Sequence, residues 1–260
     1  MKKSLIAALL AGLFAVPAMA QTPAPEAAPA AEPASPHTLT ANVGLFSSYR
    51  FRGIDQTFGQ PALQGGFDYA HSSGFYLGNW NSNISEYAGF PEGNLEMDFY
   101  GGYKLPLGDF TLDFGGLYYY YPGSKIGYTG SAVDNFEMYI GASWKFLSFK
   151  YSHALTDYFD IEDTKNTGYF DLAANYDLGD GWGINGHVGY TAVNGGPAGL
   201  DLDYTDWKIG VTKAIDNWTI GLAYVDTNAD EGTYTWVKPN SGKDIYAGKA
   251  TAVLSVSRTF

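Results

Sequence analysis

The sequence contains no cysteine, which excludes disulfide scaffolds and cysteine-ligated zinc or iron–sulfur centres. Basic residues are also few, since 15 lysines and arginines stand against 27 acidic residues and leave a net charge of −12. Nucleic-acid binding requires a basic surface that faces the phosphates, so this class of function is excluded too. Beyond the N-terminus, no apolar run is long enough to form a transmembrane helix.

The first twenty residues have the three parts of an export signal. Lys2 and Lys3 are basic, an apolar stretch runs from Leu5 to Val16, and Ala18-Met19-Ala20 gives the small-x-small cleavage pattern. The apolar stretch is too short to cross a bilayer as a helix. We therefore predict a signal peptide over residues 1–20. Its removal leaves 13 basic and 27 acidic residues, a net charge of −14.

Residues 21–36, QTPAPEAAPAAEPASP, consist mostly of proline, alanine and glutamate. Such a segment cannot bury enough apolar surface to order itself, so we predict a disordered periplasmic linker. Residues 37–260 show no second change in composition. We expect them to form one domain.

Alternation of apolar and polar residues with period two dominates this domain. In residues 94–105, Leu95, Met97 and Phe99 share one face, and Glu96 and Asp98 lie on the other. The segment lengths suit tilted strands that cross a hydrocarbon core. The pattern predicts an all-β transmembrane antiparallel up-and-down β-barrel of twelve strands. These strands are expected near 38–51, 60–70, 75–83, 94–105, 110–121, 135–144, 147–155, 168–178, 183–192, 204–213, 218–226 and 248–260.

The connections between these segments alternate between long and short. Those at 71–74, 106–109, 145–146, 179–181 and 214–217 are tight, whereas those at 122–134, 156–167, 193–203 and 227–247 are longer and polar. Outer-membrane barrels have short periplasmic turns and long extracellular loops. An even number of strands also returns the chain to the side on which it began.

The last predicted strand ends on an aromatic residue, Phe260, with Ala252, Leu254 and Val256 on the same face. An alternating strand that ends in phenylalanine looks like the signal read by the barrel-assembly machinery. The expected location is the outer membrane of a Gram-negative bacterium, with the linker in the periplasm. The expected partners are outer-membrane lipid and lipopolysaccharide, periplasmic chaperones and the barrel-assembly machinery. The oligomeric state is open, with a homo-oligomer among the options.

Four stretches carry a family resemblance: SSYRFRG from Ser47 to Gly53, PALQG from Pro61 to Gly65, GNWNSN from Gly78 to Asn83, and EMDFYGGY from Glu96 to Tyr103. They resemble the TorF family of porin-like proteins, formerly a family of conserved hypothetical proteins, and the similarity runs along the whole mature domain. The resemblance implies an outer-membrane barrel with a porin role. It implies no catalytic residues.

If the apolar face of each strand meets lipid, the other face lines the interior. Acidic residues outnumber basic ones on that face, which favours a narrow, cation-leaning diffusion channel for small solutes or ions. The same register turns Asn79, Asn81 and Asn83 inward. The predicted pore-lining residues are Arg50, Arg52, Asp68, Glu96, Asp98, Lys104, Asp113, Glu137, Lys150, Asp171, His187, Asp206 and Lys208.

Charges inside a barrel require either water or partners. The lumen is therefore either a passage or a salt-bridged plug, and the runner-up function is a closed structural or interaction barrel that acts through its loops. Arg50 and Arg52 form either a constriction that recognises anions or ion pairs with nearby carboxylates. The second interpretation is favoured.

No enzyme is predicted. Ser152 and His153 are the only candidate pair, and neighbouring strand residues face opposite sides. The acidic residues of loop 227–247 lack the spacing of a metal-binding loop, so no cofactor or metal is predicted.

Overall fold

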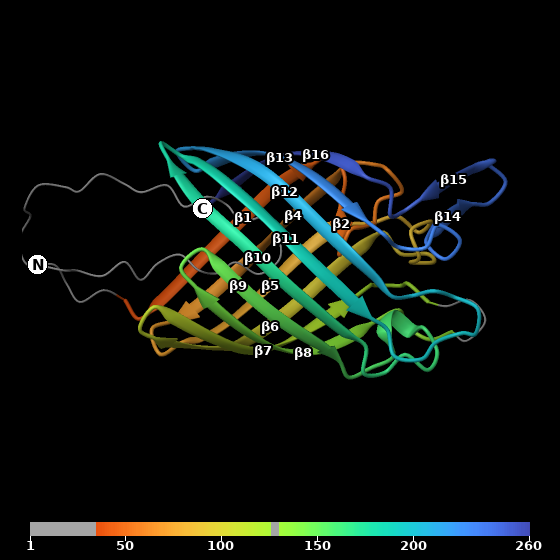
Figure 1. The fold of residues 1–260 in the computed structure, drawn as a ribbon, viewed down its shortest axis with the longest axis horizontal. Helices are drawn as coiled ribbons and strands as arrows, with labels where there is room; N and C mark the ends of the chain where they lie inside the picture. Colours follow the sequence, from red (N-terminus) through yellow and green to blue (C-terminus); the bar gives the residue numbers. More distant parts are fainter. Residues whose placement is uncertain (1–34, 126–129) are drawn as a thin grey trace, which may run out of the picture.

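The computed structural model describes residues 35–125 and 130–260. The predicted signal peptide and nearly all of the linker lie outside the described residues. Twelve strands form a closed barrel in which each strand pairs antiparallel with the next, and β16 returns to pair with β1 (Figure 1). The predicted fold class is confirmed. None of the helices in the described ranges is long and apolar enough to cross a membrane.

The barrel strands match the twelve predicted segments closely. They are β1 (His37–Phe46), β4 (Ala62–His71), β5 (Phe75–Asn83), β6 (Leu95–Leu107), β7 (Phe110–Tyr120), β8 (Asn135–Trp144), β9 (Leu147–Ala154), β10 (Gly168–Gly179), β11 (Trp182–Ala192), β12 (Tyr204–Ile215), β13 (Trp218–Thr227) and β16 (Thr251–Thr259). The loops add two short hairpins, β2 (Arg50–Phe51) with β3 (Ile54–Asp55) and β14 (Thr235–Lys238) with β15 (Lys243–Tyr246), and the single-turn helix η1 (Tyr158–Asp160).

Long and short connections lie at opposite ends of the barrel, as the sequence predicts. We call these the loop end and the turn end. The start of β1 and the C-terminus both lie at the turn end, and the β14–β15 hairpin projects from the loop end (Figure 1). Phe260 contributes to closure, because its amide donates to the Ala41 carbonyl at 2.8 Å.

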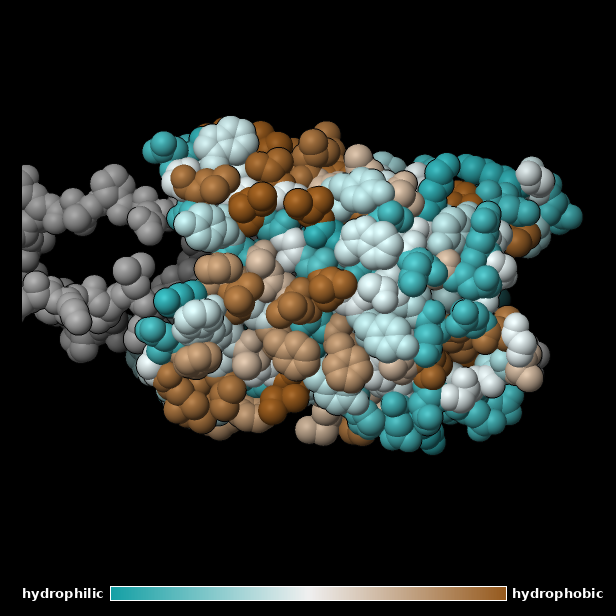
Figure 2. Space-filling model, viewed as in Figure 1, coloured by the Kyte–Doolittle hydropathy of each residue, from teal (hydrophilic) through white to brown (hydrophobic). Residues whose placement is uncertain are grey.

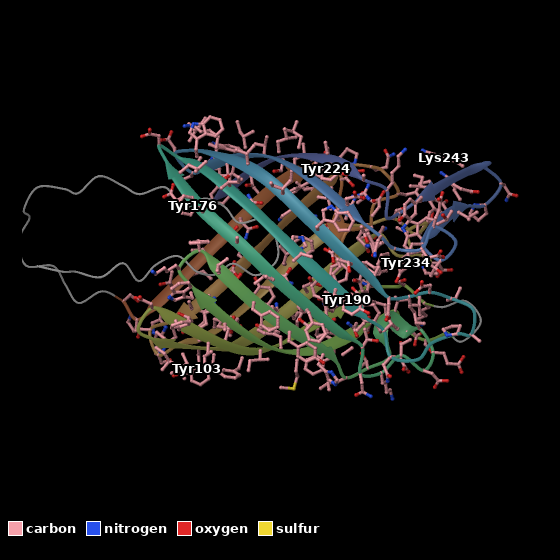
Figure 3. All side chains as sticks on the ribbon, in the orientation of Figure 1. Tyr103, Tyr176, Tyr190, Tyr224, Tyr234 and Lys243 are labelled. Atoms are coloured by element: carbon pink, nitrogen blue, oxygen red, sulfur yellow. The ribbon has the colours of Figure 1, made fainter. Side chains whose placement is uncertain are left out.

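The outer wall carries the apolar side chains. Leu39, Phe67 and Leu254 are each more than half exposed, as expected for side chains that face lipid. Figure 2 shows hydrophobic residues over the barrel wall and hydrophilic residues gathered at the loop end. Tyr103 and Tyr176 lie toward the turn end, and Tyr190 and Tyr224 lie farther along the wall (Figure 3). Aromatic residues therefore occur at both levels where an interfacial girdle is expected.

The first predicted strand is too long. Residues 38–51 were expected to form one strand, but β1 ends at Phe46 and residues 47–61 turn into the barrel. Residues 47–61, including the β2–β3 hairpin, are called the plug below. The alternation of apolar and polar residues continues into the plug, because the β2–β3 hairpin also has an extended backbone. Period two alone does not reveal where the chain leaves the wall.

The predicted inward position of Asn79, Asn81 and Asn83 is wrong. Trp80 and Ser82 take the inward positions of β5 and are buried, so the asparagines face outward. Their amides are satisfied locally, since Asn81 Nδ2 donates to Asn79 Oδ1 at 2.6 Å and Asn79 Nδ2 donates to the Asp98 carbonyl at 3.0 Å. The polar pattern gives the wrong register here. Burial of Trp80 inside the barrel is worth more free energy than it costs to place the short asparagine amides on the outer face.

Several inward glycines lie directly beneath tyrosine rings of a neighbouring strand. A Cβ on Gly115 would lie 2.4 Å from the Tyr139 hydroxyl and 2.7 Å from the Gly101 carbonyl oxygen. Gly189 has the same relation to Tyr169. These glycines make room for the tyrosine rings against the inner wall.

We therefore predict that Gly115→Ala destabilises the barrel, because either the Tyr139 ring or the strand must move. The expected loss is about 1–3 kcal/mol of unfolding free energy, measured by urea titration in detergent. Gly141→Ala is the matched control, since its new Cβ would meet nothing closer than 3.4 Å. Equal losses at both positions would contradict this packing account.

Candidate functional site

The plug presents Arg52 at the tip of a tight hairpin. Its two turn residues both have positive φ, 47° at Arg52 and 81° at Gly53. This is the favoured two-residue connection between twisted strands. Gly53 is required by close approach as well, because a Cβ there would lie 2.8 Å from the Asp206 Cβ. The left-handed backbone conformation costs an arginine about 1–2 kcal/mol of conformational free energy. Contacts of its side chain must offset this cost.

The Arg52 side chain is buried in a site built from the barrel wall. Its Nη2 donates to both carboxylate oxygens of Glu137, at 2.9 and 2.8 Å, and its Nη1 donates to the Tyr158 hydroxyl at 3.0 Å. The guanidinium carbon lies 4.1 Å from the ring centroid of Tyr169. Charge pairing, hydrogen bonding and a cation–π contact thus act on one group. We call Glu137, Tyr158 and Tyr169 the guanidinium site.

The wall holds the Glu137 carboxylate in place. Asn135 Nδ2 donates to its Oε1 at 3.2 Å, and the Tyr119 hydroxyl donates to its Oε2 at 3.4 Å. Both donors lie on strands, so the acceptor remains oriented whether or not Arg52 is present. The site is preorganised for a cationic donor.

The pKa of each loop group in this contact follows from burial and charge. Burial opposes the charged form of Arg52, but the Glu137 carboxylate outweighs it and raises the guanidinium pKa above its ordinary value. Burial raises the pKa of Tyr158 to about 12, although Arg52 acts in the opposite direction. Arg52 is therefore a permanent cation and Tyr158 a neutral hydroxyl at physiological pH.

Arg50 secures the other side of the hairpin. Its Nη1 donates to the Ala247 carbonyl at 2.7 Å, and its Nη2 donates to Thr251 Oγ1 at 3.0 Å. Nη2 also lies 3.9 Å from Asp55 Oδ2. Burial lowers the pKa of this guanidinium. Arg50 and Arg52 thus lie on the plug rather than on the wall, and both pair with carboxylates, as the favoured interpretation expected.

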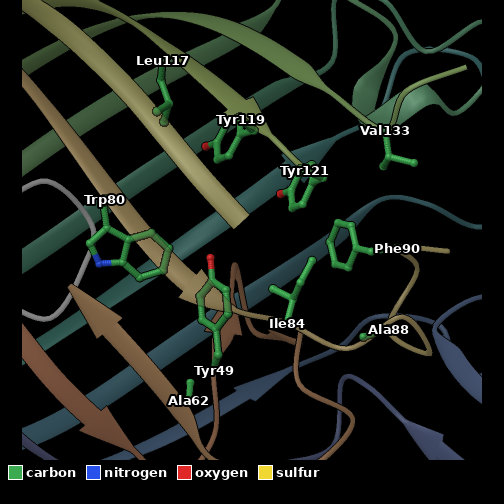
Figure 4. Packing of buried hydrophobic residues seen from close by; sticks show 10 residues of the cluster. All are labelled: Tyr49, Ala62, Trp80, Ile84, Ala88, Phe90, Leu117, Tyr119, Tyr121 and Val133. Carbon is green, nitrogen blue, oxygen red and sulfur yellow. The ribbon is translucent and has the colours of Figure 1, made fainter. Parts of the chain in front are cut away.

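Aromatic side chains fill the loop end of the barrel around the plug. Tyr49 of the plug packs edge-on against Trp80 with ring centroids 5.4 Å apart, and Tyr119 and Tyr121 line the opposite side (Figure 4). Trp236 of the β14–β15 hairpin donates from Nε1 to the Asp55 carbonyl at 2.9 Å. The plug and the longest loop therefore pack together over the loop end.

Two carboxylates beneath the plug lack full partners. Glu96 and Asp98 are 1% and 0% exposed, and only Glu96 Oε1 accepts a hydrogen bond, from the Tyr49 hydroxyl at 2.8 Å. The other oxygens, Glu96 Oε2 and both oxygens of Asp98, have no hydrogen-bond partner among the residues described. Neither Arg52 nor the plug therefore satisfies these three acceptor oxygens within the described part of the chain.

Tyrosines and lysines mix with carboxylates toward the turn end. The Tyr76 hydroxyl donates to Asp113 at 2.6 Å and contacts the Tyr139 hydroxyl. Lys104 lies over the Tyr76 ring at 5.2 Å, and Lys150 lies over the Tyr139 ring at 4.1 Å. On the neighbouring strand β4, Asp68 accepts from the Tyr100 hydroxyl.

A third group of charges lies across strands β10 to β12. His187 Nδ1 is 3.0 Å from Asp171 Oδ1, and its Nε2 is 3.7 Å from Asp206 Oδ1. Asp206 accepts from the Tyr169 hydroxyl at 3.1 Å, which joins this group to the guanidinium site. Lys208 precedes the inward Gly210 on the same face of β12.

The wall residues predicted to line the pore all lie on the inner face: Asp68, Glu96, Asp98, Lys104, Asp113, Glu137, Lys150, Asp171, His187, Asp206 and Lys208. Their role in permeation stays a prediction. Tyr158 and Tyr169 were not predicted as partners of Arg52. Tyr169 could have been found, since it shares the alternating face with Asp171. Tyr158 lies in a loop and gives no periodic signal.

The other candidates from the sequence do not assemble. Ser152 is 3% exposed and faces inward, whereas His153 Nδ1 lies 3.0 Å from the hydroxyl of Tyr151 on the outer face. Within residues 35–125 and 130–260, no three His, Cys, Asp or Glu side chains gather as a metal site would require.

We predict that Glu137→Leu weakens docking of the plug by about 3–5 kcal/mol, because it leaves the Arg52 guanidinium buried without its counter-charge. The double variant Arg52→Gly/Glu137→Leu is expected to recover most of the loss. Hydrogen exchange at amides of residues 47–61 measures docking, and Glu92→Gln in an exposed loop is the control. Unchanged exchange in Glu137→Leu would refute the ion pair as the main contact.

The barrel is similar in fold to solved porins. The KdgM porin matches with a TM-score of 0.52 at 9% identity, over 85% of this chain and 99% of that chain. The NanC porin matches with a TM-score of 0.52 at 11% identity, over 86% and 99%. At this identity the likeness shows the fold alone.

Sequence comparison gives a family but no activity. No curated protein matches the chain. The family described as "Bacterial protein of unknown function (Gcw_chp)" matches residues 30–260, which comprise the whole domain and the end of the linker. No comparison names the TorF family. The chain belongs to the Gcw_chp family of bacterial proteins.

Proposed function

We propose that this protein is an outer-membrane channel through which small cations diffuse, and that the structure represents its closed state. The observation that carries the proposal is the inner wall itself. It bears an excess of carboxylates, and three buried oxygens on Glu96 and Asp98 lack hydrogen-bond partners in the described part of the chain. An acidic wall surrounded by low-dielectric protein concentrates cations.

Closure depends on the plug rather than on the wall. The loop end is filled by residues 47–61 and the aromatic side chains that pack on them. The plug contributes no strand to the barrel, so it can move without breaking the ladder of strand pairs. The plug forms a buried ion pair with the wall, between Arg52 and Glu137. The proposed channel opens when this contact is lost.

This proposal includes a location in the outer membrane and contact with lipopolysaccharide. It also includes delivery by periplasmic chaperones to the barrel-assembly machinery, which would bind the Phe260 strand. The apolar outer wall and the pairing of Phe260 with β1 support them. The resemblance to the TorF family points to the same porin role. A homo-oligomer would be compatible with this role.

A closed barrel that acts through its loops is the second candidate. The packing of Trp236 and Tyr234 of loop 228–250 with Ile54 of the plug favours it, because this contact seals the loop end with an apolar cluster. Such a seal suits a barrel that never opens. The two candidates differ in whether removal of the plug contact yields a conducting pore.

Arg52→Gly separates them, because glycine accepts the positive φ of the hairpin turn and removes only the buried cation. In planar bilayers with a KCl gradient, we expect this variant to conduct more than the wild type, with a reversal potential of the sign for cation preference. Lys165→Ala, an exposed loop cation, is the charge-matched control. No conductance in either protein would favour the closed barrel, and anion preference would overturn the proposed selectivity.

A further inference from the structure

The guanidinium site has the features of a ligand-binding site that is occupied by the protein's own side chain. It combines a carboxylate fixed by two wall donors, a neutral hydroxyl acceptor and an aromatic face. Arg52 enters it from a loop that belongs to no barrel sheet. Glu137 and Tyr169 belong to strands and Tyr158 to the loop after β9, so the site persists when the hairpin leaves.

The contacts of Arg52 are made at a cost in backbone conformation. Arg52 has a φ of 47°, in the region where glycine or asparagine would be expected in such a turn. A hairpin that served only to fill space would be more stable with glycine at this position. The contacts of the guanidinium with Glu137, Tyr158 and Tyr169 offset the backbone cost of arginine at this position.

We propose that Glu137, Tyr158 and Tyr169 form a binding site for solutes that carry a guanidinium group, and that Arg52 is a tethered competitor that holds the channel closed until such a solute displaces it. The inference deepens the proposed function and rests on it for the link to permeation. The site suits a planar cation with two donor nitrogens, since Nη2 donates to Glu137, Nη1 donates to Tyr158 and the guanidinium carbon lies over the Tyr169 ring.

The surrounding charges favour the same class of solute. Glu96 and Asp98 lie on the inner face of β6 beneath the plug, with oxygens that lack hydrogen-bond partners in the described chain. Tyr49 of the plug donates to Glu96 Oε1, so departure of the plug frees that oxygen as well. A cation that passes the guanidinium site would therefore meet further acceptors at the same level of the lumen.

Binding can be measured without conductance, by isothermal titration of the purified protein in detergent. The probes are methylguanidinium and its uncharged counterpart methylurea. Because Arg52 occupies the site in the wild type, we expect Arg52→Gly to bind methylguanidinium at least tenfold more tightly. Adding Glu137→Gln to that variant is expected to reduce affinity at least tenfold again. Methylurea should bind to none of them.

Two comparisons keep the outcome decisive. Lys165→Ala should bind methylguanidinium as weakly as the wild type, which shows that loss of a positive charge elsewhere is insufficient. If Arg52→Gly does not fold, Arg52→Lys replaces it, because an ammonium lacks the second nitrogen with which Arg52 binds the Tyr158 hydroxyl, and this loss should weaken the competition.

Equal affinity in the wild type and Arg52→Gly, or binding that survives Glu137→Gln, would overturn the inference. Binding as expected in a barrel that never conducts would overturn the proposed channel and leave the site intact. Conductance without methylguanidinium binding would support the channel and reject the site.

Discussion

The pairing of Arg52 with Glu137 inside the barrel is the contact on which the rest of the lumen depends. It brings a strained hairpin into the loop end and sets the position of Gly53 against Asp206. It also places Tyr49 where it meets Trp80 and Glu96. Loss of this ion pair would loosen the plug residues, such as Tyr49, that pack on the aromatic cluster. The barrel ladder would remain.

Burial strengthens the attraction between Arg52 and Glu137, and it also makes loss of either partner costly. A buried ion pair is stabilising only while both partners are present, because either charge alone faces a large desolvation penalty. The pair is therefore closer to a two-state contact than to a graded one. Displacement by another cation is the route that avoids an unpaired Glu137, which is why a solute of the same chemistry is the natural trigger. Simple thermal release of Arg52 would expose Glu137 to water only if the plug left as a unit.

The barrel could be predicted from the sequence because its signals are repeated in every strand. Alternation gave the strand positions, and the parity of connection lengths gave the two ends. Inward acidic residues such as Asp98 and Asp206 followed from the same register. The prediction failed where two extended segments have the same period, at the boundary between β1 and the plug. It also failed at β5, where packing of Trp80 outweighed the polarity of Asn79 and Asn81.

The partners of the plug could not be predicted in this way, since they join residues far apart in the sequence. Arg52 and Glu137 are 85 residues apart, and Tyr158 lies 106 residues beyond Arg52. A sequence can show the unusual local feature, which is an arginine directly before a glycine in a segment too short to be a barrel strand. An arginine there makes sense only if the gain from its side chain exceeds the cost of its backbone. Positions of this kind, which break a local rule of backbone preference, are often functional sites, and the regular strands give no sign of them.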